Sequence, residues 1–493
     1  MTNTTPRILS ITGQLSKYSA FSPIAVTLFY LILTYWASDF PFFWDNVLLA
    51  SKYAQHFYEH GLQTWVVPIS IDAGHPPLFG IYLAGCWKVF GKTLAVSHWA
   101  IFPFIVGIIW FYWGIAKHLL SPSILPLAML LLVLEPCVIT QTVLANTDIA
   151  LLCMGLGAVY SLISGKYRWL YILLPIMAML SLRGIILSIA VGICHLLIFS
   201  EKRSVWGKVK STVPYYLPYV LLTTIWFVYH YQQTGFLTDN FHNNNWSGQY
   251  GIVSLGGFLR NVAVVVWRLI DQGRLFVWIS AAGILLLAFL SRQQLSKTQK
   301  KLIGTICLLL LFLLPFVVLR NTPILHRYFM LFYLLSGVLF LSLLPFLQSR
   351  FLQTSLVILT ILSLLSGHFW IYPYPIANGW DATLSVIPYF EAKEQVNRFL
   401  DEQVIRPEEV TSSFPMLSGT KFTHLTEENR FQLTGKSKCP IDQSEYVLYS
   451  NISNNFTPPE IEKLSKDFGL VKSFDSRFIK MQLFKRKYED RGK

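Results

Sequence analysis

The chain has 493 residues, of which 53% are hydrophobic and only 13% carry a charged side chain. A soluble domain carries about 25% charged residues, so this composition excludes an ordinary water-soluble protein and indicates an integral membrane protein. The formal net charge is +14. Because the lysines and arginines lie in short loops between apolar runs, they indicate membrane orientation and give no reason to expect a nucleic-acid partner.

Apolar runs, most of them long enough to cross a membrane as a helix, follow one another along the chain. We predict spans near residues 21–37, 99–116, 124–139, 149–164, 169–182, 185–199, 213–229, 275–290, 302–319, 328–347 and 352–371. Residues 262–269 are expected to form a helix in the membrane interface. The predicted fold is therefore a polytopic α-helical membrane protein with about 11 transmembrane helices and outer interfacial loop helices.

The loops between these spans differ in charge. With the N-terminus inside, the outer side holds residues 39–98, 141–148, 232–273 and 320–327, the region of Arg183 and the C-terminal tail. The inner loops then carry basic residues, as the positive-inside rule requires: Lys117, Lys166, Arg168, Lys202, Arg203, Lys208, Lys210, Arg292, Lys297, Lys300, Lys301 and Arg350. The conspicuous polar clusters share the outer side, which we expect to be the periplasmic side of a bacterial inner membrane.

The composition becomes charged and mixed from about Tyr372 onward. Residue patterns there predict a helix at 388–403, a strand at 445–450, a helix at 459–468 and one or two strands at 470–485. About 120 residues are enough for a small domain. We therefore divide the chain into a transmembrane domain at 1–371, whose first outer loop is 39–98, and a soluble extracytoplasmic α/β domain at 372–493.

Two aspartates stand at the outer beginnings of predicted helices. Asp45 precedes a helix expected over 46–60, and Asp148 closes Ala-Asn-Thr-Asp at the start of the fourth span. A carboxylate whose proton affinity is set by burial or a neighbouring cation can act as a general base, so both are candidate catalytic residues. Aspartate is also a favoured N-cap residue, and helix capping is the alternative for each.

The sequence Gly74-His75-Pro76-Pro77 predicts a rigid turn before residues 78–90, because proline fixes its own φ and holds the preceding residue extended. Such a turn can aim His75 at a ligand, or it can be purely structural. The polar and aromatic loop 241–250, which contains Trp246, suits sugar hydroxyls and an ordinary surface loop equally well.

Two arginines on the outer side run against the positive-inside tendency. Arg183 interrupts the apolar run between two spans, and Arg327 lies in His326-Arg327-Tyr328 before another. An outer arginine at the end of a span suggests an anionic partner such as phosphate, although an arginine that snorkels to the interface is the common alternative. Glu135, inside the third span, is a possible partner for one of them.

The first outer loop resembles that of C-type glycosyltransferases that use lipid-linked sugars, most closely families 39 and 83. These families include protein O-mannosyltransferases and the bacterial aminoarabinose transferases that modify lipid A. Asp148 resembles their second aspartate, and Arg327-Tyr328 resembles an Arg-Tyr pair before a late span. The loop residues that carry the resemblance are Asp45, Trp65, Pro68, Gly74-His75-Pro76-Pro77-Leu78, Ala84, Phe90-Gly91 and His98.

Four positions depart from the family pattern. Asn46 stands where a glutamate is usual, His75 where a lysine is frequent, and His98 where an arginine is common. Gly74 replaces a glutamate that binds a metal ion in some members. No metal ligands are therefore predicted, and a cofactor requirement, including one for a divalent metal, stays unknown.

The resemblance implies a hexosyl- or pentosyl-transferase that moves a sugar from a polyprenyl-phosphate donor to a lipid, glycan or protein acceptor, with inversion. It implies Asp45 as the general base, with Asp148 beside it as a second catalytic residue. The further expected contacts are Arg327, Arg183 and His75 for the donor phosphate, and Tyr328, His326 and Trp246 for the substrate. Charges at span ends favour an enzyme, but a transporter or flippase of lipid-linked glycans and a glycan ligase or polymerase stay open.

Overall fold

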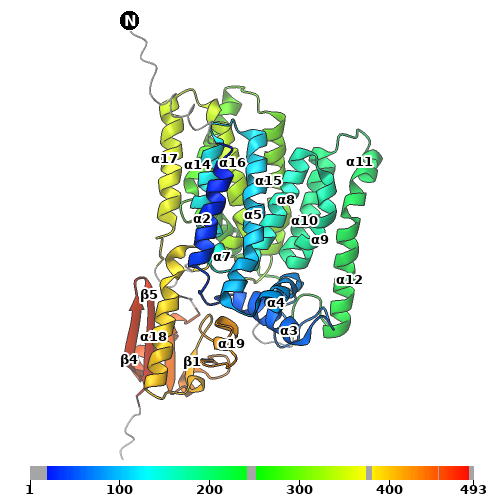
Figure 1. Ribbon diagram of the computed structural model, residues 1–493. Helices are drawn as coiled ribbons and strands as arrows, with labels where there is room; N and C mark the ends of the chain where they lie inside the picture. The colour runs from blue at the N-terminus through cyan, green and yellow to red at the C-terminus, as the bar shows by residue number, and fades with distance from the viewer. Residues whose placement is uncertain (1–18, 241–250, 373–379, 453–454, 488–493) are drawn as a thin grey trace, which may run out of the picture.

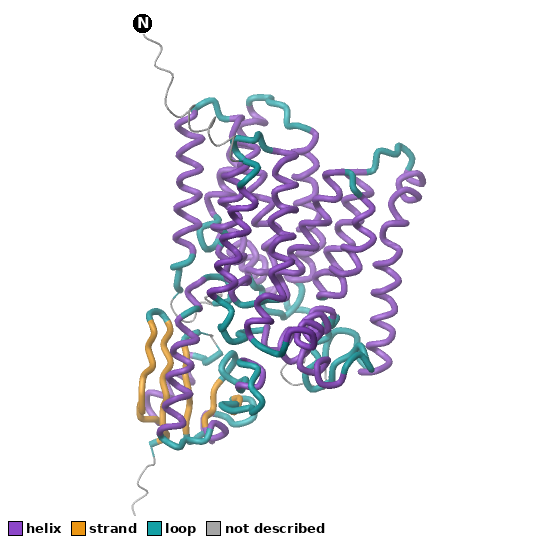
Figure 2. The backbone as a smooth tube through the Cα atoms, in the orientation of Figure 1, coloured by secondary structure: helices purple, strands orange, loops and turns teal. Residues whose placement is uncertain are grey.

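The computed structural model describes residues 19–240, 251–372, 380–452 and 455–487. The chain is 66% helical, and a bundle of apolar helices stands above a small sheet domain (Figures 1 and 2). The helices of the bundle are α2 (Ser22–Trp36), α5 (Leu94–Leu119), α6 (Leu125–Leu134), α7 (Pro136–Val143), α8 (Thr147–Ser164), α9 (Leu170–Leu180), α10 (Leu182–Cys194), α12 (Leu217–Thr234), α13 (Leu255–Ile270), α14 (Leu275–Leu290), α15 (Lys297–Val318), α16 (Met330–Leu343) and α17 (Arg350–Gly367).

Shorter helical segments connect or extend these helices. Three of them lie in the predicted first outer loop, where η1 (Val47–Lys52) is a π-helical turn continued by α3 (Tyr53–His60), and α4 (Leu78–Phe90) follows the Pro-Pro turn. The others are η2 (Tyr167–Trp169), η3 (His195–Phe199), α11 (Val205–Thr212), η4 (Val213–Tyr216), η5 (His326–Phe329) and η6 (Leu344–Phe346).

Within the described residues, six helical segments are long and apolar enough to cross a membrane, or up to eight if each of two bent pairs is one span. Shorter apolar helices occupy Ser22–Trp36, Leu78–Phe90 and Tyr167–Leu180. Each predicted span falls on a helix of the bundle, so the membrane-protein fold is confirmed. The predicted count of eleven crossing helices is not confirmed.

The two bent pairs have identifiable local causes. Helices α6 and α7 meet at 56°. Glu135 between them is extended, and Pro136 begins α7. Proline interrupts a continuous helix here because it has no N–H to donate and its ring clashes with the preceding turn. Helices α13 and α14 meet at 91°. Gln272 and Gly273 turn there with φ of 53° and 84°, and a Cβ on Gly273 would lie 2.0 Å from the carbonyl oxygen of Ser363.

The two ends of the bundle differ in what they carry. The start of α2 and the basic helix α11 lie at one end, whereas α3, α4 and the sheet domain lie at the other (Figure 1). The two ends correspond to the predicted inner loops, which are basic, and to the predicted outer loops, which carry the polar clusters. The site described below lies at the end of the sheet domain.

The C-terminal residues form one five-stranded sheet with the order β2-β1-β3-β5-β4. Its parallel strands β1 and β3 are flanked by β2 on one side, and β4 and β5 form an antiparallel hairpin on the other. The elements are α18 (Pro388–Glu402), β1 (Val410–Ser412), α19 (Thr420–Thr423), β2 (Thr434–Gly435), β3 (Tyr446–Ser450), α20 (Pro458–Asp467), β4 (Phe468–Ser476) and β5 (Ile479–Arg486). Both predicted helices and the predicted strands are confirmed, whereas the short strands β1 and β2 carry no sequence pattern of their own.

The sheet domain packs directly on the loop that contains Asp45. Phe43 belongs to the apolar core of the sheet domain, and its ring centre lies 4.7 Å from that of Tyr389. The carbonyl oxygens of Phe422 and Thr423 accept hydrogen bonds from Ser51 and from the backbone of Phe42, at 2.6 and 2.8 Å. The first outer loop is therefore clamped between the bundle and the sheet domain.

Candidate active site

Arg327 is the centre of a charged cluster at this junction. It lies in η5 and is 4% exposed. Its Nη2 contacts the carboxylate of Asp45, its Nε lies 2.9 Å from Oδ2 of Asp148, and its Nη1 lies 2.5 Å from Oδ2 of Asp381. Because a buried charge without a partner is strongly destabilising, the carboxylates are what allow a guanidinium here.

Asp148 joins Arg327 to a second arginine. Oδ1 of Asp148 lies 2.6 Å from Nη2 of Arg183, which is 8% exposed. The Arg183 guanidinium lies 4.1 Å from the centre of the Tyr328 ring, a cation–π contact. Helix α10 is capped by Ser181, whose hydroxyl accepts a hydrogen bond from the N–H of Gly184 at 3.1 Å, so Arg183 is held in a capped first turn. We call Asp45, Asp148, Arg183, Arg327 and Asp381 the site cluster.

The capping alternative is wrong for both aspartates. Helix α8 is capped by Asn146, whose side chain accepts the N–H of Asp148 at 3.1 Å. In η1 the cap position is Asn46 and no side chain caps it. The snorkelling alternative is also wrong, because Arg183 and Arg327 are buried and paired with carboxylates.

Asp45 is oriented by its neighbours in Phe-Trp-Asp-Asn. Trp44 has a positive φ of 59°, and its ring centre lies 4.7 Å from that of Phe414 in the sheet domain. Asn46 is buried and donates to the carbonyl oxygen of Leu144 at 2.7 Å, which ties the loop to the segment before Asp148. The Asp45 side chain is 28% exposed, against 6% for Asp148 and 1% for Asp381, so it is the carboxylate most accessible to a second substrate.

The Gly-His-Pro-Pro turn is built as predicted and is fixed by Asp72. Gly74 has a φ of 70°, and a Cβ there would lie 2.2 Å from the carbonyl oxygen of Thr238. Oδ1 of Asp72 accepts the N–H of Gly74 at 2.7 Å, and Oδ2 lies 2.9 Å from Nε2 of His230 in α12. The turn is thereby anchored to the bundle from both sides.

The anchored turn places His75 in the electrostatic field of the site cluster. Burial, and secondarily the charge of Arg183, lower the pKa of His75 to about 4, against the opposing effect of Asp45, Asp148 and Asp72. The ring is therefore neutral at neutral pH. It can offer a phosphate a hydrogen bond but no positive charge.

Asp381, which follows the last membrane helix, is not among the residues predicted from the sequence. Its backbone carbonyl accepts a hydrogen bond from Gln141 of α7, and its buried Oδ1 has no hydrogen-bond partner among the described residues. Burial raises the pKa of this carboxyl; Arg327 opposes the rise, and Asp45 and Asp148 add to it. Asp45 and Asp381 occupy the two Trp-Asp pairs of the chain, but a dipeptide that occurs twice does not indicate a site, so the sequence held no signal for Asp381.

A pocket with one charged end lies beside the cluster. Asp148, Arg183, Arg327 and Tyr328 line its polar part. The rest of its wall is apolar and consists of Leu151, Leu152, Leu187, Met330 and Leu331. The lining therefore joins two arginines and a carboxylate to an apolar wall.

One of the predicted substrate contacts, His326, is not brought to this site. The His326 side chain is 0% exposed, and its Nε2 lies 2.8 Å from Oδ2 of Asp271 and 3.5 Å from Nη1 of Arg268. Trp246 lies outside the described residues. Tyr328 does reach the site, through its contact with Arg183.

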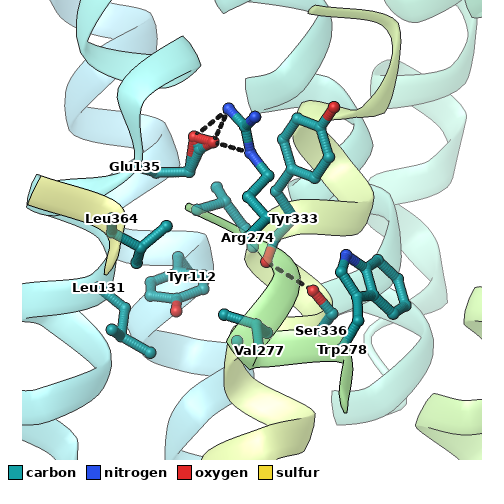
Figure 3. A pocket seen from close by; sticks show the side chains of 11 residues that line it. Tyr112, Leu131, Glu135, Arg274, Val277, Trp278, Tyr333, Ser336 and Leu364 are labelled. Carbon is teal, nitrogen blue, oxygen red and sulfur yellow. Dashed lines mark hydrogen bonds and ion pairs between the residues drawn. The ribbon is translucent and has the colours of Figure 1, made fainter. Parts of the chain in front are cut away.

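Glu135 pairs with Arg274, and not with Arg183 or Arg327 as the sequence suggested. Both oxygens of Glu135 face the Arg274 guanidinium, which lies 3.9 Å from the centre of the Tyr333 ring (Figure 3). The pair joins the break between α6 and α7 to the break between α13 and α14. Each side chain neutralises the buried charge of the other. We call Glu135, Arg268, Asp271, Arg274 and His326 the support cluster.

In the part of the chain that the structure describes, no group of three or more His, Cys, Asp or Glu side chains is placed to hold a metal ion.

Comparison with known proteins gives a likeness of fold. No protein-family model and no curated protein sequence matches the chain. The crystal structure of ArnT from Cupriavidus metallidurans in the apo state aligns with a TM-score of 0.53 and 12% identity, over 94% of this chain and 97% of that one. The structure of ArnT bound to undecaprenyl phosphate aligns with a TM-score of 0.49 and 13% identity over the same shares. The likeness to apo ArnT extends the resemblance seen in the first outer loop to the fold of the whole chain.

Proposed function

We propose that the chain is a membrane glycosyltransferase that moves a sugar from a polyprenyl-phosphate donor to an acceptor hydroxyl, on the outer face of a bacterial inner membrane. The carrying observation is that Arg183, Arg327 and the more exposed Asp45 converge beside a pocket with an apolar wall. The shared fold supports this reading, because ArnT is a lipid A aminoarabinose transferase of the C-type class.

The pocket suits the donor. Its apolar wall, formed by α8, α10 and α16, can contact the first isoprene units, while Arg183 and Arg327 face the phosphate. The phosphate becomes the leaving group when the bond from the anomeric carbon to its oxygen breaks. Two guanidinium groups that already lie at that position stabilise the developing charge without rearranging.

Asp45 is the proposed general base. The acceptor oxygen attacks the anomeric carbon from the face opposite the phosphate, its proton passes to Asp45, and the products are the glycoside with inverted configuration and polyprenyl phosphate. Asp148 contacts both arginines, so its proposed role is to hold them in place.

The test replaces Asp45 by asparagine, which keeps the size of the side chain and removes proton acceptance. We expect Asp45→Asn to lower turnover by roughly 10²-fold or more. The measurement is transfer of a labelled sugar from its polyprenyl phosphate in membranes, at matched expression. Asp148→Asn is the matched control and should raise the KM for donor more than it lowers turnover. Near-normal turnover by Asp45→Asn would remove it as the base.

A transporter of lipid-linked glycans is the second candidate, because two helix pairs are broken and charged residues stand at both breaks. Transporters use such broken helices to bind substrate. The two readings differ in product. Vesicles that contain the purified protein, donor and acceptor should form glycoside if the protein is a transferase, and should only move donor across the bilayer if it is a transporter.

A further inference from the structure

The charges of the site cluster do not balance. Three carboxylates, from Asp45, Asp148 and Asp381, face two guanidinium groups, from Arg183 and Arg327. His75 adds no charge at neutral pH. With all three carboxylates ionised the cluster carries excess negative charge, and a bound phosphate adds more. Like charges repel strongly in a desolvated site, which favours the movement of one carboxylate away from the phosphate.

Carboxylates also surround the arginine. Nη2 and Nη1 of Arg327 donate hydrogen bonds to Asp45 and Asp381, whereas Nε lies 2.9 Å from Oδ2 of Asp148 without a hydrogen bond. A phosphate recognises arginine through paired N–H groups, so it can bind Arg327 only where a carboxylate leaves.

The three carboxylates differ in how firmly they are held. Asp148 uses one oxygen for each arginine and lies in the first turn of α8. Asp45 is partly exposed and is the proposed base, which the reaction needs in place. Asp381 makes one side-chain contact, through Oδ2 to Arg327, and its buried Oδ1 has no partner among the described residues. Asp381 is therefore the least firmly held of the three carboxylates.

We propose that Asp381 is a displaceable counter-ion of Arg327, which leaves the arginine when the donor phosphate binds and returns to it to help release the polyprenyl-phosphate product. This proposal rests on the proposed function. Burial raises the pKa of Asp381, Arg327 opposes the rise, and Asp45 and Asp148 add to it. Its backbone stays held by Gln141.

The proposal predicts opposite effects on binding and on release. Neutral variants at this position, Asp381→Asn and Asp381→Ser, should bind undecaprenyl phosphate roughly tenfold more tightly, because one like charge is gone. Their steady-state turnover should fall a few-fold because product leaves more slowly, while the rate of a single turnover stays unchanged. Asp381→Glu keeps the charge and should not bind more tightly.

The experiment measures binding of labelled undecaprenyl phosphate to purified protein in detergent, followed by steady-state and single-turnover transfer. Asp401→Asn is the control in the same domain, because Asp401 forms an exposed ion pair with Arg430, and its binding should match that of the wild type. A single-turnover rate that falls with the neutral variants would show that Asp381 acts in the chemistry, and weaker binding would show that it contacts the donor. Either result overturns displacement.

The remaining outcomes also decide. Equal binding by wild type and the neutral variants refutes the displacement proposal but leaves the proposed function standing. No binding of undecaprenyl phosphate by the wild type refutes the proposed function and this proposal with it. If both neutral variants fail to fold while Asp381→Glu folds, the fold requires the charge, and a carboxylate the fold requires is not displaceable.

Discussion

The molecule contains two buried clusters of arginines and carboxylates that differ in balance and access. In the support cluster, Glu135 and Asp271 match Arg268 and Arg274, and every one of these side chains is at most 8% exposed. In the site cluster, carboxylates outnumber arginines and Asp45 is 28% exposed. The first cluster closes two helix breaks, whereas the second lies beside a pocket.

The difference separates a structural charge network from a candidate binding site. A balanced and closed network is satisfied without a ligand, and its net effect on stability is small or unfavourable relative to apolar packing. An unbalanced and open network is satisfied only when something else binds or a proton moves. Similar residue types therefore have different expected mutational signatures, in folding for the support cluster and in activity for the site cluster.

Glu135→Gln should have the largest effect on stability, because it leaves the Arg274 guanidinium buried without a counter-charge. We expect the free energy of unfolding to fall by about 3–5 kcal/mol, measured by thermal or denaturant unfolding in detergent. Donor KM of the protein that remains folded should be unchanged. The double variant Glu135→Met, Arg274→Met is the control and should recover most of the loss, since it removes both charges.

A loss of stability with unchanged donor KM would support a structural role for the support cluster, and two other results would contradict it. A stable Glu135→Gln variant that no longer transfers sugar would place the support cluster in the substrate path and would strengthen the transporter reading. A stable and active variant would show that Arg274 finds other partners.

The sequence indicated part of the site and missed part of it for physical reasons. Asp45, Asp148, Arg183 and Arg327 each interrupt an apolar run or begin a span, and charges at membrane depth are visible because they are costly. The structure places these four side chains in contact with one another, although their catalytic and binding roles stay predictions.

Asp381 and the support cluster were missed because their environment is set by tertiary packing. Asp381 lies in a region of mixed composition where one aspartate among many polar residues carries no pattern. His326 precedes Arg327 in η5 and was expected beside it, but its side chain points to Asp271. The membrane-span prediction located the helices, whereas the bends at Glu135 and Gly273 depend on contacts that periodicity does not encode.

Substitution of Arg327 tests the role of the site cluster in donor binding and turnover. Arg327→Ala removes the central positive charge, and we expect kcat/KM for donor to fall by roughly 10²-fold or more, because one member of a buried charge pair is lost. Arg327→Lys should retain more activity, since it keeps the charge and loses the planar fork. A titration with the labelled donor separates the variants. Wild-type kinetics for Arg327→Ala would return this arginine to a structural role like that of Arg274.

The smallest expected effect concerns pH and His75, which belongs to neither cluster but lies in the field of the site cluster. Its pKa in the folded protein is about 4, below the ordinary value of 6.5. Between these values the unfolded chain binds a proton that the folded chain does not, so the contribution of His75 to stability is full above pH 6.5 and is lost as the pH falls toward 4.

The loss on acidification should amount to about 1–3 kcal/mol, and His75→Gln should remove it, because glutamine does not titrate. Thermal unfolding between pH 7.5 and roughly pH 4.5, inside that window, should show a flatter dependence for His75→Gln than for the wild type. His60→Gln is the matched control, since His60 is exposed at the end of α3 in the same loop, and its profile should follow that of the wild type. A parallel acid loss in His75→Gln would mean that the pKa of His75 is not lowered by folding. A steeper acid loss in His75→Gln than in the wild type would mean that the folded protein holds the ring protonated, as a third cation that offsets the excess carboxylate of the site cluster.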